Sequence, residues 1–397
     1  ALQGTSAGVA VTAPSGSPGG GFNILIRGVS SNGDNGPLII IDGYKGELNT
    51  INPSDIETFS VLKDAQAAIY GIEGANGVVL VTRKSGKKNQ ALKINYNVFT
   101  GFQQTSRKLP YLNATEYGLL INESRAANGE TLPYPDVSGL GVGTNWQDEV
   151  FATAPITNHN FSAAGGGETS TYYVGGGFVD QQGIVAPEKS NFRRGNLKIK
   201  LGFDIGKKLT FTTSANYFNQ NRQSIGENAL GTPLFNALNY APTYGIDEED
   251  STGFLGNEVI NPLSQLRDTY NEYNGNAIEG TFQLVYKPIE GLSITSRIGV
   301  RAYNDKGKNF SPEVEYGSGK VFNNPRSSVY QYRNTNNSYT FENFATYQKT
   351  FAENHNTSFT LGTSAIREWG DGLNGTGYDV PNNSWDFADI SLANGLN

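Results

Sequence analysis

The fold is decided by residues 196–217, which read NLKIKLGFDIGKKLTFTTSANY. Apolar side chains hold the odd positions from 197 to 205 and, after the link Gly206-Lys207, most odd positions from 209 to 217. Alternation with a period of two predicts β-strands that have one apolar and one polar face. The short link between two such segments predicts an antiparallel hairpin.

The same alternation recurs along the chain after residue 87. We expect about nine strands, near residues 92–103, 156–165, 170–181, 192–205, 208–221, 276–287, 291–304, 334–350 and 356–368. The links between them alternate in length, so that the long links fall at one end of the sheet and the tight turns at the other. This asymmetry is typical of an outer-membrane barrel. A soluble antiparallel β-protein is the alternative, and the asymmetry of the links disfavours it.

The sequence therefore predicts a transmembrane antiparallel β-barrel, of which residues 87–397 form the N-terminal part with long extracellular loops. Single-chain bacterial barrels have even strand numbers, so we expect further strands outside the given residues. Residues 1–86 read as a separate α+β domain. Its continuous apolar runs at 38–41 and 78–81 predict buried strands, and Asp64 is expected to cap a helical turn over 65–70 that Gly71 ends.

Composition excludes several classes of function. The 397 residues contain no cysteine, which excludes a disulfide framework and a thiolate metal site within them. The net charge of −7 argues against a nucleic-acid partner. The only histidines, His159 and His355, lie far apart in the sequence, so we expect no metal, no cofactor and no enzymatic site.

Two groups of residues are candidates for binding a ligand. Asn32, Asp34 and Asn35 form a polar tip that follows a predicted strand, although the same residue types also make ordinary turns. Trp146 lies in a proposed outer loop, where an indole can stack on a sugar ring, anchor an interface or pack the loop itself. The acidic run 247–250 suits either a calcium ion or, as we favour, a solvated loop.

The N-terminal 82 residues carry ordered sequence blocks that resemble the plug domain of the SusC/RagA family of TonB-dependent receptors. The blocks are residues 1–9, 16–20, 26–28, 37–43, 52–57, 61–65, 68–71 and 75–82. Residues 375–378 are similar to the barrel of that family, more weakly.

The resemblance implies a plug inside a 22-stranded barrel in the cell outer membrane, surrounded by outer-membrane lipid. It implies import of oligosaccharides or peptides, driven by the TonB-ExbB-ExbD complex, with a SusD-like surface lipoprotein as lid. A signal peptide, an N-terminal extension and a TonB-contact segment are expected before Ala1.

The resemblance also implies roles for individual plug residues. The family's plug motif falls on Asp42, Gly43, Tyr70, Gly71, Asn76 and Gly77. Arg27 and Glu73 occupy positions expected to lock the plug to the barrel, but the family usually has arginine where this chain has Glu73. An anion at a buried pairing site would reverse the attraction. We therefore keep a second hypothesis, a SusC-like structural subunit that joins other outer-membrane subunits and does not transport.

Overall fold

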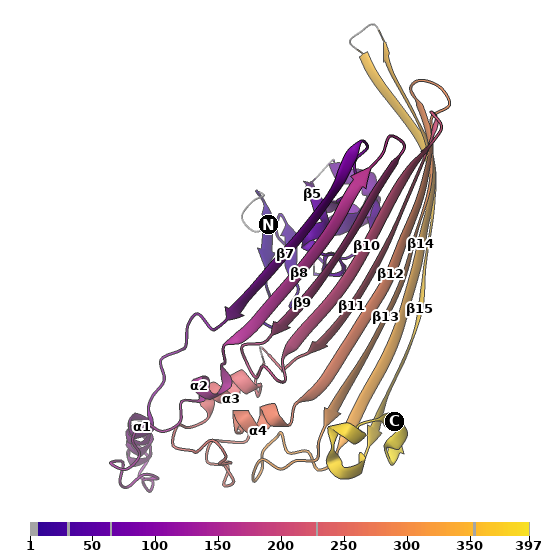
Figure 1. Ribbon diagram of the computed structural model, residues 1–397. Coiled ribbons are helices and arrows are strands. Elements are labelled where there is room, and N and C mark those ends of the chain that lie inside the picture. The colour runs from indigo at the N-terminus through magenta and orange to yellow at the C-terminus, as the bar shows by residue number, and fades with distance from the viewer. Residues whose placement is uncertain (1–6, 30–31, 64–65, 228, 352–354, 397) are drawn as a thin grey trace.

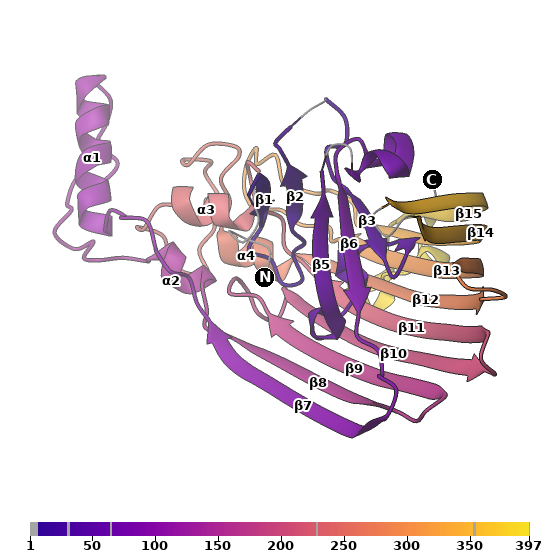
Figure 2. The ribbon, with the colours of Figure 1, turned by 90° about the horizontal axis from the view of Figure 1, so that it is seen from above.

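The computed structural model describes residues 7–29, 32–63, 66–227, 229–351 and 355–396. Their largest unit is a curved antiparallel sheet, which we call the wall, and the N-terminal plug lies against the concave side of this sheet (Figures 1 and 2). The predictions of a large antiparallel sheet and of a separate N-terminal domain with buried strands are confirmed.

The wall contains ten strands in sequence order, and each is hydrogen-bonded to the next. They are β7 (Gln90–Gln103), β8 (Ala154–Gly166), β9 (Ser170–Gln182), β10 (Asn191–Ile205), β11 (Leu209–Gln223), β12 (Tyr270–Tyr286), β13 (Leu292–Ser311), β14 (Ser328–Phe351), β15 (His355–Tyr378) and the short β16 (Gly395–Leu396). All nine expected strands are present. Several run further than expected, since polar residues beyond the apolar part still pair through their backbones; β12, for instance, begins at Tyr270 instead of residue 276.

Tight turns join β8 to β9, β10 to β11 and β12 to β13 at one end of the wall, and the long loops lie at the other end (Figure 1). The two faces of the wall are distinguished by a row of directly paired residues. Lys198, Asn216, Glu279, Arg301 and Ser338 are register partners across β10 to β14. The last four of them line a cavity shared with the plug, so this row faces inward. Residues one position away face outward.

The outward residues form an apolar band close to the tight turns. Exposed apolar side chains along this band include Leu197, Ile199, Phe203, Ile278, Phe282, Leu284, Ile294, Val300, Phe341 and Phe359. Amide and charged side chains follow the band toward the long loops, as on β13, where Asn304 and Lys306 come after Ala302. A band of this kind between polar zones is the pattern of a strand that faces lipid.

The plug has its own small sheets. A hairpin joins β1 (Val9–Thr12) and β2 (Asn23–Ile26), and a four-stranded sheet has the order β4 (Tyr44–Lys45), β3 (Leu38–Ile41), β6 (Val78–Arg83), β5 (Ile56–Leu62). Short 3-10 helices complete it: η1 (Leu48–Thr50), η2 (Pro53–Asp55) and η4 (Ala68–Gly74). Val78, Val79 and Val81 are buried, as their continuous apolar run predicts.

Asp64, the expected cap of the helical turn, lies outside the described residues. Gly71 does interrupt η4, with a φ of 63°. The domain boundary at residue 86 stays a prediction: β6 ends at Arg83, and β7 begins at Gln90.

The long loops carry short helices: α1 (Ala114–Ala127), α2 (Trp146–Val150), α3 (Pro233–Asn239) and α4 (Pro262–Arg267). Helices α2 to α4 pack around a core of their own that includes Trp146, Tyr240 and Leu266. We call the loop residues 144–153, 224–227 and 229–269, together with Lys320, the loop cluster. Three 3-10 helices follow β15: η5 (Pro381–Asn383), η6 (Trp385–Phe387) and η7 (Ile390–Leu392). No helix among the described residues is long and apolar enough to span a membrane.

Candidate functional site: the contact between plug and wall

The plug meets the wall largely through polar side chains. Asn52 of the plug donates a hydrogen bond from Nδ2 to Oδ1 of Asn160 on β8, at 2.7 Å. The Tyr173 hydroxyl on β9 donates to Oδ1 of Asp55 at 2.5 Å, and both groups are buried. These bonds place side chains of the plug directly against inward positions of two adjacent wall strands.

Two cations of β10 reach carbonyl oxygens of the plug backbone. Lys198 donates from Nζ to the Lys84 carbonyl at 2.8 Å, and Arg194 donates from Nη1 to the Asn49 carbonyl at 2.9 Å. Lys198 is only 2% exposed, and its ammonium lies 4.9 Å from the centre of the Tyr173 ring. A buried ammonium needs partners of this kind, because its desolvation is otherwise costly.

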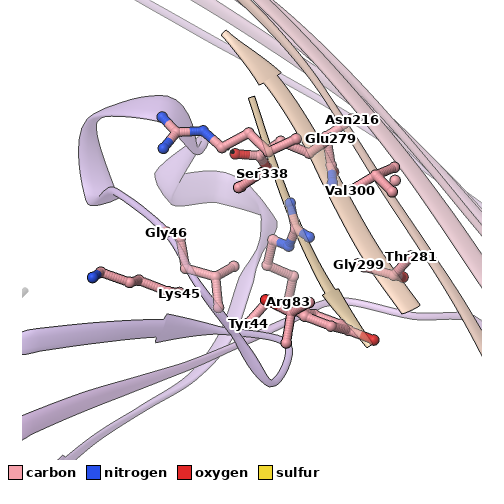
Figure 3. A pocket seen from close by; sticks show the side chains of 14 residues that line it. Tyr44, Lys45, Gly46, Arg83, Asn216, Glu279, Thr281, Gly299, Val300 and Ser338 are labelled. Carbon is pink, nitrogen blue, oxygen red and sulfur yellow. Dashed lines mark ion pairs between the residues drawn. The ribbon is translucent and has the colours of Figure 1, made fainter. Parts of the chain in front are cut away.

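The arginines of β13 contact another part of the plug, on either side of Gly299, which lies against Tyr44 (Figure 3). The Arg297 guanidinium lies 5.3 Å from the Tyr44 ring centre and also pairs with Glu342 on β14. Arg301 donates to Glu47 of the plug at 3.0 Å and lies 3.6 Å from Glu279 on β12. Arg297 therefore contacts an aromatic ring of the plug while it pairs with a carboxylate of the wall. Arg301 pairs with a carboxylate of the plug and lies close to one of the wall.

Glycines of the wall create the space for these contacts. A Cβ at Gly175 would lie 2.6 Å from Asp55 Oδ1, one at Gly177 would lie 2.4 Å from Asn52 Nδ2, and one at Gly299 would lie 2.4 Å from the Tyr44 ring. On β9, Gly175 and Gly177 face inward, whereas Gly176 between them meets only the Asn196 carbonyl at 3.5 Å. Because side chains alternate along the strand, Gly175 and Gly177 lie against the plug and leave room for its side chains, whereas Gly176 does not contact the plug.

We call the wall residues of these contacts the plug seat. They are Asn160, Tyr173, Gly175, Gly177, Arg194, Lys198, Arg297, Gly299 and Arg301.

A small polar cavity remains between Tyr44 and the wall. Its volume is about 50 Å³, and it is lined from the plug by Tyr44 and Arg83 and from the wall by Asn216 and Glu279, among others. The Tyr44 hydroxyl and Asn216 Nδ2 are buried without a hydrogen-bond partner among the described residues. Burial raises the pKa of the Tyr44 hydroxyl to about 12, against the opposing effect of Arg297, so the phenol is neutral at physiological pH. A cavity of this size with unpaired polar atoms suits a bound water molecule.

The motif residues Asp42 and Gly43 lie where the plug sheet faces the seat. Asp42 accepts hydrogen bonds from the Arg83 amide at 2.9 Å and from Arg83 Nε at 2.7 Å, and both side chains are almost fully buried. Burial by itself would raise the pKa of Asp42, but the Arg83 charge and amide, with help from Lys198 and Lys200, hold it below its usual value. Gly43 has a φ of 94°, and a Cβ there would lie 2.6 Å from Arg297 Nη1.

The other motif residues maintain the plug itself. Asn76 donates from Nδ2 to the Asp34 carbonyl at 2.9 Å. Gly77 has a φ of 89° and accepts a hydrogen bond from the Leu38 amide at 3.0 Å. Tyr70 packs beside buried Val78, next to the kink at Gly71.

Arg27 and Glu73, the expected locking residues, both lie on the exposed surface of the plug. Glu73 pairs with Lys45 of the plug at 3.2 Å, and the side chains of both are more than half exposed. Within the described residues, the charge of Glu73 is therefore compensated by a neighbouring lysine of the plug. Pairing of Arg27 or Glu73 with the barrel stays a prediction.

The candidate ligand-binding residues differ in their environments. Asn32, Asp34 and Asn35 form a largely exposed turn, in which the Gly36 amide donates to Asp34 Oδ1 at 2.8 Å. They are accessible, and contact with a ligand stays a prediction. Trp146 is fully buried, donates from Nε1 to the Ala241 carbonyl at 3.0 Å and lies edge-on to Tyr240. The structure thus shows the packing role for Trp146 and leaves no free indole face for stacking.

The acidic run 247–250 is not simply solvated. Asp250 forms a fully buried ion pair with Lys320 at 2.6 Å, and Lys320 also donates to the carbonyls of Gly256 and Val259. In the part of the chain that the structure describes, no cluster of three or more His, Cys, Asp or Glu could hold a metal ion.

Sequence reasoning missed most of the plug seat. In the strand pattern, Lys198 and Arg301 are only polar alternates, and alternation does not say what a polar side chain contacts. The triplet Gly175-Gly176-Gly177 in the middle of a strand was an available signal, since glycine inside a strand often marks close approach of another backbone or ligand.

Comparison with known proteins agrees with this architecture. Residues 1–78 match the model of the TonB-dependent receptor plug domain. A TonB-dependent receptor of Formosa agariphila is 33% identical to this chain, over 98% of the chain and 40% of that protein. The TonB-dependent receptor SusC of Bacteroides thetaiotaomicron is 36% identical, over 72% of the chain and 31% of that protein.

Among solved structures, the RagAB peptide transporter superposes with a TM-score of 0.83 at 23% identity, over 99% of this chain and 48% of that one. At this identity the likeness shows the fold. The chain spans less than half the length of the relatives that it matches. With its plug, its antiparallel wall and these relatives, the chain is part of a SusC/RagA-like TonB-dependent receptor.

Proposed function

We propose that the full-length protein is a SusC-like TonB-dependent transporter of the outer membrane, which imports oligosaccharides or peptides together with a SusD-like lipoprotein lid. TonB, energised by ExbB and ExbD, would pull on the plug and open the barrel. The names of the relatives support a TonB-dependent receptor, and the ligand classes and the lid come from the resemblance.

The observation that carries the proposal is the polar attachment of the plug. The named contacts between plug and seat are hydrogen bonds, ion pairs and cation–π contacts, such as Asn52 with Asn160 and Lys198 with the Lys84 carbonyl. Water can replace hydrogen bonds of this kind at a small net cost, about 1 kcal/mol each. The buried apolar residues of the plug instead form clusters within the plug, around Val79 and Val78. The plug can therefore leave its seat without exposing a shared apolar core.

Glu73 gives no support to the non-transporting alternative, because its charge is paired within the plug. The transport proposal is tested by fastening the plug to the wall. The 397 residues contain no cysteine, so Asn52→Cys and Asn160→Cys can be joined by a short, cleavable bifunctional thiol reagent. We expect uptake of the cognate oligosaccharide or peptide by cells to stop after cross-linking and to return when the linker is cleaved.

The matched control joins two wall strands and leaves the plug free. Thr346 on β14 and Thr360 on β15 approach each other at 3.0 Å between hydroxyl oxygens, so Thr346→Cys with Thr360→Cys takes the same reagent. This variant should transport normally after cross-linking. Undiminished uptake with Asn52 and Asn160 linked would contradict a mechanism that moves the plug.

A further inference from the structure

The outward face of the wall carries two cations that oppose each other without compensation. Lys306 on β13 and Arg333 on β14 are direct register partners. Each lies five positions from an inward residue, Arg301 and Ser338 respectively, and therefore faces outward. Both are exposed, and neither lies within ion-pair distance of a carboxylate among the described residues. Like charges directly opposite on a sheet are destabilising, so the arrangement indicates an anion that binds between them.

The position of this pair along the strands identifies what it would meet. On β13 the lipid-facing apolar band ends at Ala302, and Lys306 follows two outward positions later; the next apolar outward residue, Phe310, is buried in a cluster with residues of the segment after β15. On β14 the lipid-facing apolar band begins at Tyr339, and Arg333 precedes it by three outward positions; Val329, at the start of the strand, is outward but buried in the same cluster as Phe310. At about 3.3 Å per residue and a tilt of about 40°, Lys306 lies about 10 Å beyond the edge of the apolar band. This is the level of lipid headgroups on the side of the long loops.

The pair lies in a hollow of the outer surface. The hollow has a volume of about 1200 Å³, extends across the ends of β10 to β15 and is bordered by Asp389, Ile390 and Ser391 of the segment after β15. Its floor offers hydrogen-bond donors from the neighbouring outward amides Asn274 and Gln331. In Figure 1 this segment lies at the C-terminal, yellow end of the chain, beside the lower ends of β13 to β15.

The charge of the hollow is positive, although the chain as a whole is acidic. Its outward lining side chains include four cations and two carboxylates: Arg193, Lys306, Lys308 and Arg333 against Glu272 and Asp389. Asp389 is occupied by hydrogen bonds from Ser391 and Gln331, and Lys308 lies over the Trp385 ring at 3.7 Å. Arg193 pairs with Asp180 at 3.0 Å. Lys306 and Arg333 are thus the cations of the hollow that are best placed to take an external anion.

We propose that Lys306 and Arg333 bind the phosphorylated headgroup of a lipid in the outer leaflet. Lysine and arginine both bind phosphate oxygens by charge-assisted hydrogen bonds, and arginine does so with two parallel donors. A headgroup suits the site better than a soluble anion, because the site faces away from the plug and adjoins the apolar band, where acyl chains pack. The inference rests on the proposed outer-membrane barrel.

The test measures lipid binding by the purified full-length protein in detergent micelles. The probes are diphosphorylated lipid A, the same lipid without its phosphates, and inorganic phosphate. We expect the phosphorylated lipid to bind the wild type at least tenfold more tightly than it binds the double variant Lys306→Gln, Arg333→Gln. Removal of the phosphates should abolish this difference, and Lys306→Arg should keep the wild-type affinity.

The matched control removes two exposed lysines at the opposite end of the strands, Lys207→Gln with Lys287→Gln, and should bind like the wild type. Equal lipid binding by the wild type and the Lys306, Arg333 variant overturns the proposal. Inorganic phosphate that competes at the same concentration as the lipid also overturns it, as does an acidic polypeptide that co-purifies through these two residues in place of lipid.

The two proposals fail in distinguishable ways. A wild-type protein that does not insert into the outer membrane as a heat-modifiable barrel contradicts the proposed function. A protein that inserts and transports, but whose lipid binding ignores Lys306 and Arg333, contradicts the lipid site alone.

Discussion

At the scale of single residues, the plug seat depends as much on absent side chains as on present ones. Tyr173 can donate to Asp55 because position 175, beside both, has no Cβ. The plug seat could not be identified from sequence, because a strand pattern shows which positions alternate but does not show which of the two faces contacts another domain. Motif positions such as Asp42 and Gly43 were found through the resemblance, and their physical role became visible only beside Arg83 and Arg297.

The glycine triplet of β9 provides a prediction with its control on the same strand. A methyl group at Gly175 would meet Asp55 Oδ1 at 2.6 Å and the Tyr173 hydroxyl at 2.8 Å. We expect Gly175→Ala to weaken the attachment of the plug by about 1–3 kcal/mol through overpacking. Gly176→Ala, which faces outward, should change it by less than about 0.5 kcal/mol. The measurement is the urea concentration at which the plug becomes sensitive to protease, and equal shifts for both variants would contradict this account of the seat.

At the scale of strands, alternation was sufficient to place all nine long strands but not their ends. Strand β14 begins at Ser328, before the expected 334, and β15 runs to Tyr378 beyond the expected 368. The extension of β15 is rich in glycine and polar residues, and that of β14 mixes tyrosine with polar residues, so neither shows a regular apolar alternation. Hydrophobic periodicity ends where the lipid-facing band ends, whereas the backbone ladder continues, so sequence reasoning located the band rather than the strand.

The band itself is testable on β12. Phe282 lies in the middle of the outward apolar run and is 49% exposed, and Asn276 lies on the same face just beyond the run. A charge at the middle of the bilayer is costly, so Phe282→Arg should lower the free energy of unfolding by about 2–4 kcal/mol. Asn276→Arg should cost about 0–1 kcal/mol, since an arginine there reaches the polar interface. Folding titrations in lipid vesicles measure both, and a reversed order would place the band elsewhere.

At the scale of the whole molecule, the chain contains separate cores joined by polar contacts. The plug has clusters around Val79 and Val78, and the loop cluster is built around Trp146 and Tyr240. Sequence analysis predicted the plug and the wall but not the loop cluster. Its helices are only five to seven residues long, too short to give a periodic pattern, and its buried pair Asp250–Lys320 joins positions 70 residues apart.

Because the loop cluster has a core of its own, we expect acid to affect it separately from the wall. Burial alone would raise the pKa of Asp250, but the hydrogen bond from Lys320 and the amides of Leu255 and Phe254 hold it below its ordinary value. A carboxyl with a lowered pKa contributes stability above its unfolded pKa of about 3.9, and this contribution is lost as pH falls through the lower folded value. We therefore expect the loop cluster to loosen below about pH 4 while the wall stays folded.

The emission of Trp146 reports this loosening, in a variant whose other tryptophans are replaced by phenylalanine. It should shift to longer wavelength as the indole meets water, with the β-sheet circular dichroism unchanged. Asp250→Asn supplies the control. It should be less stable by about 3–5 kcal/mol at neutral pH, because Lys320 is left buried without its anion, and its stability should no longer fall through this pH window. If the stability of Asp250→Asn depends on pH in the same way as that of the wild type, the acid response arises from other carboxylates.

The polar attachment of the plug has a consequence for the speed of its release. When an apolar interface separates, no favourable contact with solvent forms until the gap admits water, so the barrier is high and sensitive to every ångström of opening. The contact between plug and wall instead places Tyr44 and Asn216 beside a cavity large enough for water, and the donors and acceptors of the contact can exchange one partner for another in turn. The plug can then separate from the wall through a series of hydrogen-bond exchanges with water, each of which changes the free energy only slightly. A modest, sustained force would suffice to complete that series, and the same steps in reverse would let the plug settle back without a chaperone.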